Sequence, residues 1–99
     1  MTPAVAIFIA KPGCEAELEA LFLDVIAPTH AEQGCRQYQL NRDVENSRRF
    51  VWTELWDSRA ELDRHLGQTH ITELFLRVPE LVEHSEVIVL EKVDGGIVR

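Results

Sequence analysis

Apolar residues recur along this chain with two periods that alternate in a fixed order. Residues 5–10 form a near-continuous apolar run closed by a Lys-Pro-Gly turn, which predicts a buried strand. Residues 15–26 carry apolar side chains at helical spacing instead, with glutamates early, where the helix dipole favours anions. Pro28 disturbs the last part of this predicted helix, and Gly34 is a candidate for its end.

A hairpin and a second helix are predicted in the middle of the chain. Residues 35–42 alternate as a strand does, the polar segment 43–47 predicts a loop, and the aromatic and β-branched residues 50–56 predict the returning strand. Ser58 followed by Glu61 predicts a capping box, in which the hydroxyl and the carboxylate each bind a free backbone N–H at the helix start.

The last third of the chain predicts a further helix and a fourth strand. Residues 71–78 have helical spacing, Pro79 starts or kinks a last turn, residues 86–92 read as a strand, and the tail is expected to be flexible from about residue 94. The order strand, helix, strand, strand, helix, strand predicts one α+β domain over residues 1–99. It is the ferredoxin-like βαββαβ arrangement, a four-stranded antiparallel sheet with helices on one face.

The first and fourth predicted strands are apolar at both parities of their alternating side chains. Helices can cover only one face of the sheet. The other face would then expose a larger apolar patch than monomeric proteins usually tolerate. The sequence therefore predicts a homodimer, in which a second copy of the chain covers that face.

Composition and charge exclude several classes of partner. The hydrophobic fraction of 45% and charged fraction of 27% are those of an ordinary globular domain. The net charge of -7 argues against nucleic acid or an anionic membrane, which would require a basic face. No apolar run approaches the roughly 20 residues that span a bilayer. The first apolar run lacks a basic segment before it, so it does not resemble a signal peptide, and the predicted location is the cytoplasm.

Two cysteines, Cys14 and Cys35, form no recognisable motif. A cytosolic chain would keep both reduced, so we expect small, buried or half-buried thiols. Cys14 stands at a predicted helix start, where a thiol could become reactive, and is the weaker alternative reading.

The richest potential chemistry lies where the third strand meets the following helix. Alternation places Trp52, Glu54 and Trp56 on one strand face, and helical spacing places Leu62 and His65 on one helix face. His65 is either a core histidine with one partner or a general base that lines a pocket. Glu54 either orients His65 or forms an ion pair with an arginine (Arg49 or Arg59), because a buried glutamate needs a partner.

The two tryptophans and three further residues complete the candidate site. Trp52 and Trp56 could wall an apolar slot that stacks a flat aromatic substrate, or could be core residues. Tyr38 could donate a hydrogen bond to a substrate oxygen or cap the sheet edge. His70, at a helix start, could be a second polar group of the pocket or a solvent-facing cap. Phe75 is a core residue or a further wall of the slot, beside Leu62.

No cofactor is predicted. Glu61, His65 and His70 are close in sequence, but Glu61 is assigned to the helix cap. No other strong metal ligand stands at a usual spacing beside the two histidines, so no metal is expected. Phosphate-binding loops and dinucleotide motifs are missing from the sequence, and the histidines form no clear axial-ligand arrangement for haem.

Taken in order, these segments resemble the antibiotic biosynthesis monooxygenase family over essentially the whole chain. The resemblance is carried by Lys11-Pro12-Gly13, Gly34-Cys35-Arg36-Gln37-Tyr38, Phe50-Val51-Trp52-Thr53-Glu54-Leu55-Trp56, Leu62-Asp63-Arg64-His65-Leu66 and Thr69-His70. It implies a homodimer whose two sheets pack face to face as a dimeric α+β barrel. It also implies oxidation of quinol-like or polyketide aromatic substrates by O2 without metal or flavin. The family is functionally mixed, since similar domains degrade haem or isomerise a signalling sugar phosphate.

Two alternatives from other classes stay open. One is an isomerase of a small hydroxy-ketone, phosphorylated or not, in which His65 and Glu54 would shuttle a proton; a pocket lined by Arg36, Arg42 or Arg77 would favour it. The other is a non-catalytic module that binds a small aromatic molecule.

Overall fold

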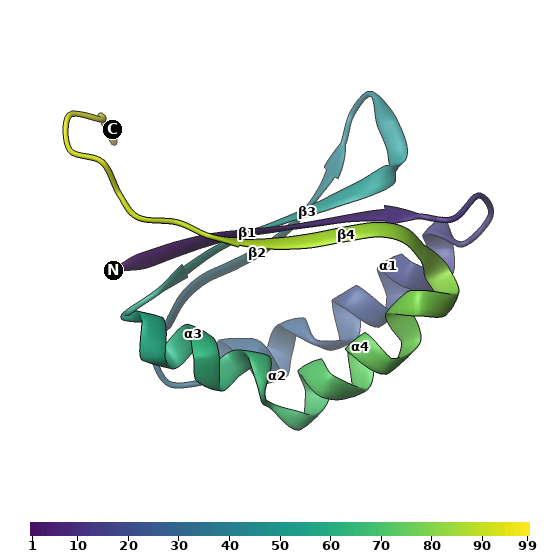
Figure 1. The fold of residues 1–99 in the computed structure, drawn as a ribbon, viewed down its shortest axis with the longest axis horizontal. Helices are drawn as coiled ribbons and strands as arrows, with labels where there is room; N and C mark the ends of the chain where they lie inside the picture. The colour runs from purple at the N-terminus through teal and green to yellow at the C-terminus, as the bar shows by residue number, and fades with distance from the viewer.

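A computed structural model describes residues 1–99 as two layers, an antiparallel sheet and the helices that cover one of its faces (Figure 1). The elements are β1 (Thr2–Ala10), α1 (Glu15–Asp24), α2 (Ile26–His30), β2 (Cys35–Asp43), β3 (Asn46–Trp56), α3 (Arg59–Leu66), α4 (Thr69–Leu81) and β4 (Val82–Val89). The strands lie in the order β2-β3-β1-β4, and every neighbouring pair is antiparallel. This confirms the predicted ferredoxin-like α+β fold.

The first helical segment is broken where the sequence contains a proline. α1 ends at Asp24, one residue lies between, and α2 contains Pro28 in its first turn. Proline is tolerated there because the first-turn N–H groups have no acceptor within the helix. The prediction of one helix through residue 26 is therefore wrong in detail. The break lets the chain turn toward the sheet before β2.

The fourth strand begins earlier than the sequence pattern indicates. β4 starts at Val82, directly after α4, and the prediction of a strand over residues 86–92 is wrong by four residues at its start and three at its end. β4 is an edge strand, and Glu83, His84 and Ser85 are exposed in it. Polar side chains at consecutive positions of such a strand hide the alternation by which a half-buried strand is recognised.

The start of α3 has the predicted position but not the predicted hydrogen bonds. Ser58 is the N-cap residue, with φ −155° and ψ 170°, and its hydroxyl donates to the Glu61 carboxylate instead of serving a backbone N–H. The reciprocal capping box is therefore not formed. Gly34 packs against this pair with φ +85°, and its carbonyl accepts the backbone N–H of Asp57 at 2.8 Å. The loop between α2 and β2 is thereby held against α3.

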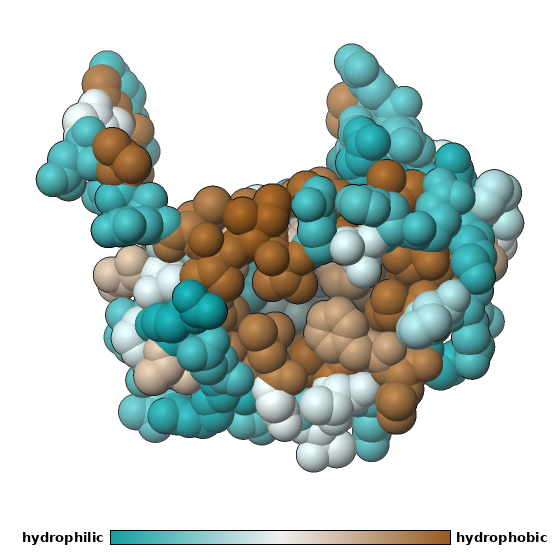
Figure 2. Space-filling model, in the orientation of Figure 1, coloured by the Kyte–Doolittle hydropathy of each residue, from teal (hydrophilic) through white to brown (hydrophobic).

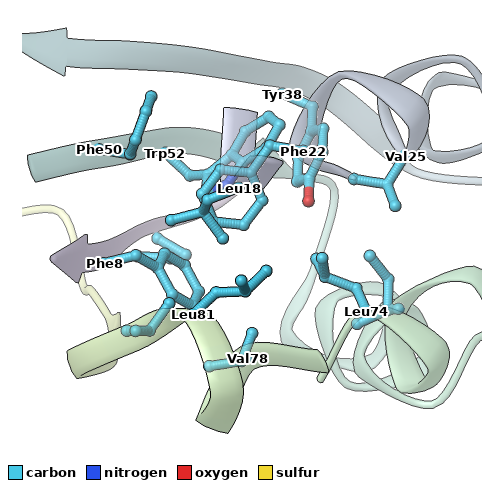
Figure 3. Close-up of a cluster of buried hydrophobic side chains, with 14 of the residues drawn as sticks. Phe8, Leu18, Phe22, Val25, Tyr38, Phe50, Trp52, Leu74, Val78 and Leu81 are labelled. Carbon is cyan, nitrogen blue, oxygen red and sulfur yellow. The ribbon is translucent and has the colours of Figure 1, made fainter. Parts of the chain in front are cut away.

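The core lies between the sheet and the helices and is rich in aromatic rings. Phe22 of α1 is at its centre, with ring centroids 5.0 Å from Phe8, 5.7 Å from Phe50 and 5.5 Å from Trp52. Figure 3 shows these rings with the aliphatic side chains of α1 and α4 around them. On β1 the buried helix-facing positions other than Phe8 are alanines, which leave room for the large rings of the neighbouring strand.

The opposite face of the sheet has no helix over it (Figure 1). Val5, Ile7 and Ile9 of β1 point to this face and are only half-buried, and they pair with Thr53, Val51 and Arg49 of β3. The predicted apolar character of both faces of β1 is thus confirmed. None of the helices is both long and apolar enough to cross a membrane.

Candidate functional site

A small cavity lies between the sheet and the helices α3 and α4. Its volume is about 20 Å³, and most of its lining is hydrophobic, with Tyr38, Glu54 and His65 as the polar members. Figure 2 shows this hollowed side of the molecule, with hydrophobic residues gathered around the opening between the two layers. The strand face of β3 and the inner face of α3 meet at this cavity, so the structure brings together the side chains that the sequence pattern placed on those two faces.

His65 occupies the last turn of α3 and is 2% exposed. Its Nδ1 lies 2.9 Å from Oε2 of Glu32, in the loop after α2, so the expectation that Glu54 is its hydrogen-bond partner is wrong. An ionised carboxylate only accepts hydrogen bonds, so neutral His65 carries its proton on Nδ1. Nε2 is then the unprotonated nitrogen of a ring that lines the cavity.

The ring of His65 is held on two sides by aromatic side chains. Its centroid lies 4.7 Å from that of Trp56 and 5.2 Å from that of Tyr38. Trp56 is completely buried and does not line the cavity, whereas Trp52 does. In this structure the two indoles do not face each other across a slot, and Trp56 serves as a support for His65.

Glu54 also lines the cavity, and its partner is the neighbouring indole. Trp56 donates its Nε1–H to Oε1 of Glu54 at 2.9 Å. Neither proposed arginine reaches Glu54, because Arg49 binds Asp43 at 2.9 Å and Arg59 binds Asp63 at 3.0 Å. Burial raises the pKa of the Glu54 carboxyl, and the hydrogen bond from Trp56 and the nearby His65 oppose this in part. The carboxyl of Glu54 therefore ionises less readily in this cavity than it would in water.

Tyr38 is a buried hydroxyl beside the histidine. Its ring stacks on Trp52 with centroids 4.2 Å apart, and Figure 3 shows its oxygen directed into the space between sheet and helices. Burial raises the pKa of Tyr38 far above its ordinary value, and the charge of Glu54 adds to the effect. Tyr38 is therefore a neutral hydrogen-bond donor at every physiological pH.

His70 does not line the cavity but is connected to His65 through a shared carboxylate. Its Nε2 lies 2.8 Å from the same Oε2 of Glu32 and 3.2 Å from the hydroxyl of the fully buried Thr29. The side chain of His70 is 22% exposed and that of Glu32 is 10% exposed. The site is thus a chain of polar contacts that leads from the cavity toward the surface.

Sequence reasoning missed Glu32 and Thr29. Both lie where α2 ends and the chain turns, outside any periodic pattern, and Glu32 meets partners 33 and 38 positions away. Two weak signals were present. An isolated acidic residue precedes Gly34, and a polar residue follows Pro28 in a short helix, positions from which side chains can reach under neighbouring elements.

The remaining predicted wall residues take up the expected places. Leu62 and Phe75 both line the cavity, together with Val87 of β4. Phe75 and Val87 are 36% and 40% exposed, so they form the outer part of the lining. The cavity mouth therefore lies between α4 and the edge strand.

None of the three arginines that would favour a phosphorylated substrate lines the cavity. Arg36 binds Asp57 at 2.6 Å, Arg42 contacts Glu19, and Arg77 lies 3.6 Å from both Glu17 and Glu80. All three are on the surface. A cavity lined by arginine would have favoured the isomerase alternative, and this cavity has no arginine in its lining.

The free thiol nearest the site is Cys35, which is half-buried at the start of β2. Burial raises its pKa to about 11, and the charges of Glu32 and Glu54 contribute to the shift. A thiol with so high a pKa is protonated at neutral pH and is a poor nucleophile. This argues against thiol chemistry at this position.

The fold and this cavity define a class: a ferredoxin-like domain with one partly apolar site enclosed between its sheet and its helices. A family model described as antibiotic biosynthesis monooxygenase matches residues 1–75. The chain belongs to the antibiotic biosynthesis monooxygenase family, as its sequence motifs indicated.

Individual relatives agree with this assignment. The chain is 36% identical over 85 residues to "Putative monooxygenase Rv0793" of Mycobacterium tuberculosis, with 83% of each chain covered. The solved structure of Rv0793 superimposes with a TM-score of 0.88, covering 97% of this chain and 98% of that one at 33% identity. PA3566 from Pseudomonas aeruginosa gives 0.85, at 32% identity and 93% coverage of both chains. A solved antibiotic biosynthesis monooxygenase gives 0.88 at 26% identity, covering 94% of this chain and 99% of that one.

Proposed function

We propose that this protein is a cytoplasmic monooxygenase that oxidises a quinol-like or polyketide aromatic substrate with O2 and needs neither metal nor flavin. The observation that carries the proposal is the arrangement of His65. One nitrogen is hydrogen-bonded to Glu32, and the other belongs to a ring that lines a mainly apolar cavity. A carboxylate that fixes the tautomer in this way makes the free nitrogen a competent base.

The chemistry requires the substrate to supply the electrons. Ground-state O2 is a triplet and reacts poorly with closed-shell molecules, whereas an aromatic enolate or phenolate can transfer an electron to it. In the proposed reaction Nε2 of His65 removes a proton from the substrate. The anion gives one electron to O2, the two radicals combine to a peroxide, and loss of water leaves a carbonyl. For an anthrone CH2 group the balance is CH2 + O2 → C=O + H2O.

Tyr38 and Glu54 are the proposed partners of the substrate oxygens. The raised pKa of Tyr38 keeps its hydroxyl protonated, so it can donate to an oxyanion throughout the reaction. Glu54 lines the same cavity, and burial raises its pKa as well. His70 acts at a distance, since it shares the Glu32 carboxylate with His65.

Substrate binding requires the cavity to widen. A volume of about 20 Å³ holds one molecule of the size of water. An aromatic ring therefore has to displace side chains at the mouth. Phe75 and Val87 are the residues to move, because they are the most exposed members of the hydrophobic lining. Trp52 and Leu62 would then contact the bound ring.

We further propose a homodimer in which the open faces of two sheets pack together. The half-buried apolar residues of β1 support it, as do Val51 and Leu55 of β3, which point the same way. Light scattering should give about twice the chain mass of 11.3 kDa. Ile7→Asp should yield a monomer or an unfolded chain, because a buried unpaired charge costs several kcal/mol. A stable wild-type monomer at micromolar concentration would contradict the barrel.

The proposed activity is tested by oxygen consumption on a panel of quinols and anthrones, with and without a chelator. We expect uptake with at least one electron-rich substrate, one labelled oxygen atom from 18O2 in the product, and no loss of rate with chelator. Uptake that disappears with the chelator would contradict the metal-free reaction. Tight aromatic binding without any uptake would instead support the binding-module alternative.

A further inference from the structure

Three side chains with metal-binding atoms converge beside the cavity. Nδ1 of His65, Nε2 of His70 and a carboxylate oxygen of Glu32 all lie within 4.8 Å of one another. They come from three segments, since His65 lies in the last turn of α3, His70 in the first turn of α4, and Glu32 in the loop before β2. The short interruption around Gly67 lets two histidines five residues apart reach the same oxygen. The sequence-based argument that a third ligand is missing therefore does not hold in the folded chain.

From this geometry we propose that Glu32, His65 and His70 bind a divalent transition-metal ion of the zinc type. Two imidazoles and one carboxylate are a donor set that suits Zn2+ and its first-row neighbours and is poor for Mg2+ or Ca2+. Three protein ligands leave one position for water, as in open zinc sites. Glu61, which is bound to Ser58, takes no part.

The distances between the two histidines and Glu32 allow one metal ion to take the place of the two hydrogen-bonded protons. Both histidines are hydrogen-bonded to the same carboxylate oxygen, at 2.9 Å and 2.8 Å. A tetrahedral zinc with bonds of about 2.1 Å separates its ligand atoms by about 3.4 Å. The two contacts therefore have to lengthen by about half an ångström, which small side-chain rotations provide.

The ion can reach this cluster from solvent. Glu32 and His70 line a surface hollow of about 450 Å³, which shares no lining residue with the cavity that His65 lines. The exposed fraction of the side chains falls from the surface inward, from 22% for His70 to 10% for Glu32 and 3% for His65. Metal exchange would thus not require the apolar cavity to open.

Occupation of the cluster has a consequence for His65 that rests on the proposed function. An imidazole that coordinates metal through Nδ1 carries its proton on Nε2. The nitrogen proposed as the base toward the cavity would then be a donor. The metal-bound form should therefore be unable to remove the substrate proton, so that zinc acts as an inhibitor of a metal-free reaction.

Zinc binding is measured without substrate, by calorimetry or by competition with a chromophoric chelator, on the full chain. We expect one Zn2+ per chain, and at least about a 100-fold weaker affinity in His70→Ala, since even outer partners of metal ligands change affinity 10–100-fold. Glu32→Gln should lose binding similarly while it keeps an oxygen that accepts hydrogen bonds. His84→Asn is the matched control, because His84 lies 3.5 Å from Glu86 in the chain's remaining histidine–carboxylate pair, and should bind as the wild type does.

Two spectroscopic measurements complete the test. Nitrogen NMR of the histidine rings should show the proton of His65 moving from Nδ1 to Nε2 when Zn2+ is added. Co2+ should give visible absorption that His70→Ala lacks. Wild-type affinity in both folded variants, or zinc binding that leaves the His65 signals unchanged, would overturn the site.

The effect of zinc on the rate of oxidation is measured separately. If a substrate is oxidised, added Zn2+ should lower the rate in wild type and in His84→Asn alike. Zinc bound at the cluster without loss of rate would overturn the inhibitory consequence but not the site. If no substrate is ever oxidised, the binding and NMR results still decide the metal site, and the failure belongs to the proposed function.

Discussion

The space between the sheet and the helices has two halves that are built on the same strands but differ in chemistry. In the half under α1 and the end of α4, the side chains of Leu18, Phe22, Phe50 and Leu81 are buried, and all four are apolar (Figure 3). In the half under α3, the same sheet face carries Glu54, which lines one cavity together with His65. His65 is in turn hydrogen-bonded to the carboxylate of Glu32. β3 runs through both, from Phe50 in the first to Trp56 in the second.

The difference separates stability from chemistry. The apolar half contributes the burial that stabilises small domains, about 25 cal/mol per Å² of apolar surface. The polar half desolvates carboxylates and imidazoles, which is unfavourable unless each finds a partner. Each does, because no buried polar side-chain atom is left without a hydrogen bond. Substitutions in the two halves should therefore have different consequences, and the following predictions use that contrast.

The largest expected effect is on turnover, in the polar half. His65→Gln keeps most of the side-chain volume and a hydrogen-bonding group but removes the titratable ring. We expect a folded dimer whose rate with an active substrate falls by roughly 10²–10⁴-fold. Stopped-flow oxygen consumption measures it, with His84→Gln as the exposed control. Normal turnover would make His65 structural, and a chain that fails to fold would make it a core residue.

A stability effect of comparable size is expected in the apolar half. Leu18 is fully buried in α1, and Leu18→Ala should lower the free energy of unfolding by about 2–5 kcal/mol. Leu23 is on the same helix but 52% exposed, and Leu23→Ala is the matched control, with an effect near zero. Urea titration measures both. Turnover per folded molecule should be unchanged in Leu18→Ala, and a selective loss of rate would contradict the separation of the two halves.

The apolar half was also the more predictable half. Its residues recur with the period of a strand or a helix, so the helix-facing positions of β1, β3 and α1 follow from the pattern alone. The prediction failed where the apolar residues do not follow the period of a single strand or helix. β4 is an exposed edge strand, and the break between α1 and α2 depends on how Pro28 is accommodated.

In the polar half, the sequence predicted only the side chains that lie on β3 and α3. Alternation placed Glu54 beside the same cavity as His65, yet the hydrogen-bond partner of His65 is Glu32. That contact is between residues 33 positions apart and depends on the path of a loop, which local patterns do not encode. The metal-ligand cluster was missed for the same reason, since it requires Glu32.

A smaller effect is expected at the glycine that holds this loop in place. Gly34 has φ +85°, and a Cβ there would lie 2.3 Å from Cγ of Glu61, whereas Gly13 has φ +86° with nothing within 4 Å. Gly13→Ala should cost about 1–2 kcal/mol from backbone strain alone. Gly34→Ala should cost more and displace Glu32 from His65, which lowers turnover as well. Equal losses of stability in the two variants, with unchanged rates, would show that the close packing of this loop on α3 does not position the site.

The smallest expected effect is a pH dependence of stability that distinguishes the polar half. Burial raises the pKa of Glu54 in the folded chain above its value of about 4.5 in the unfolded chain. Well below pH 4.5 the carboxyl is neutral in both states. As the pH rises toward the folded pKa, the unfolded chain releases this proton first, so the wild type loses stability. Glu54→Gln keeps an oxygen for the Trp56 N–H and cannot ionise. Its stability relative to the wild type should therefore increase from pH 4.5 upward in urea titrations, since every other titrating group is common to both chains. A difference independent of pH would show that the carboxyl ionises as easily in the cavity as in water, which would contradict the raised pKa of Glu54.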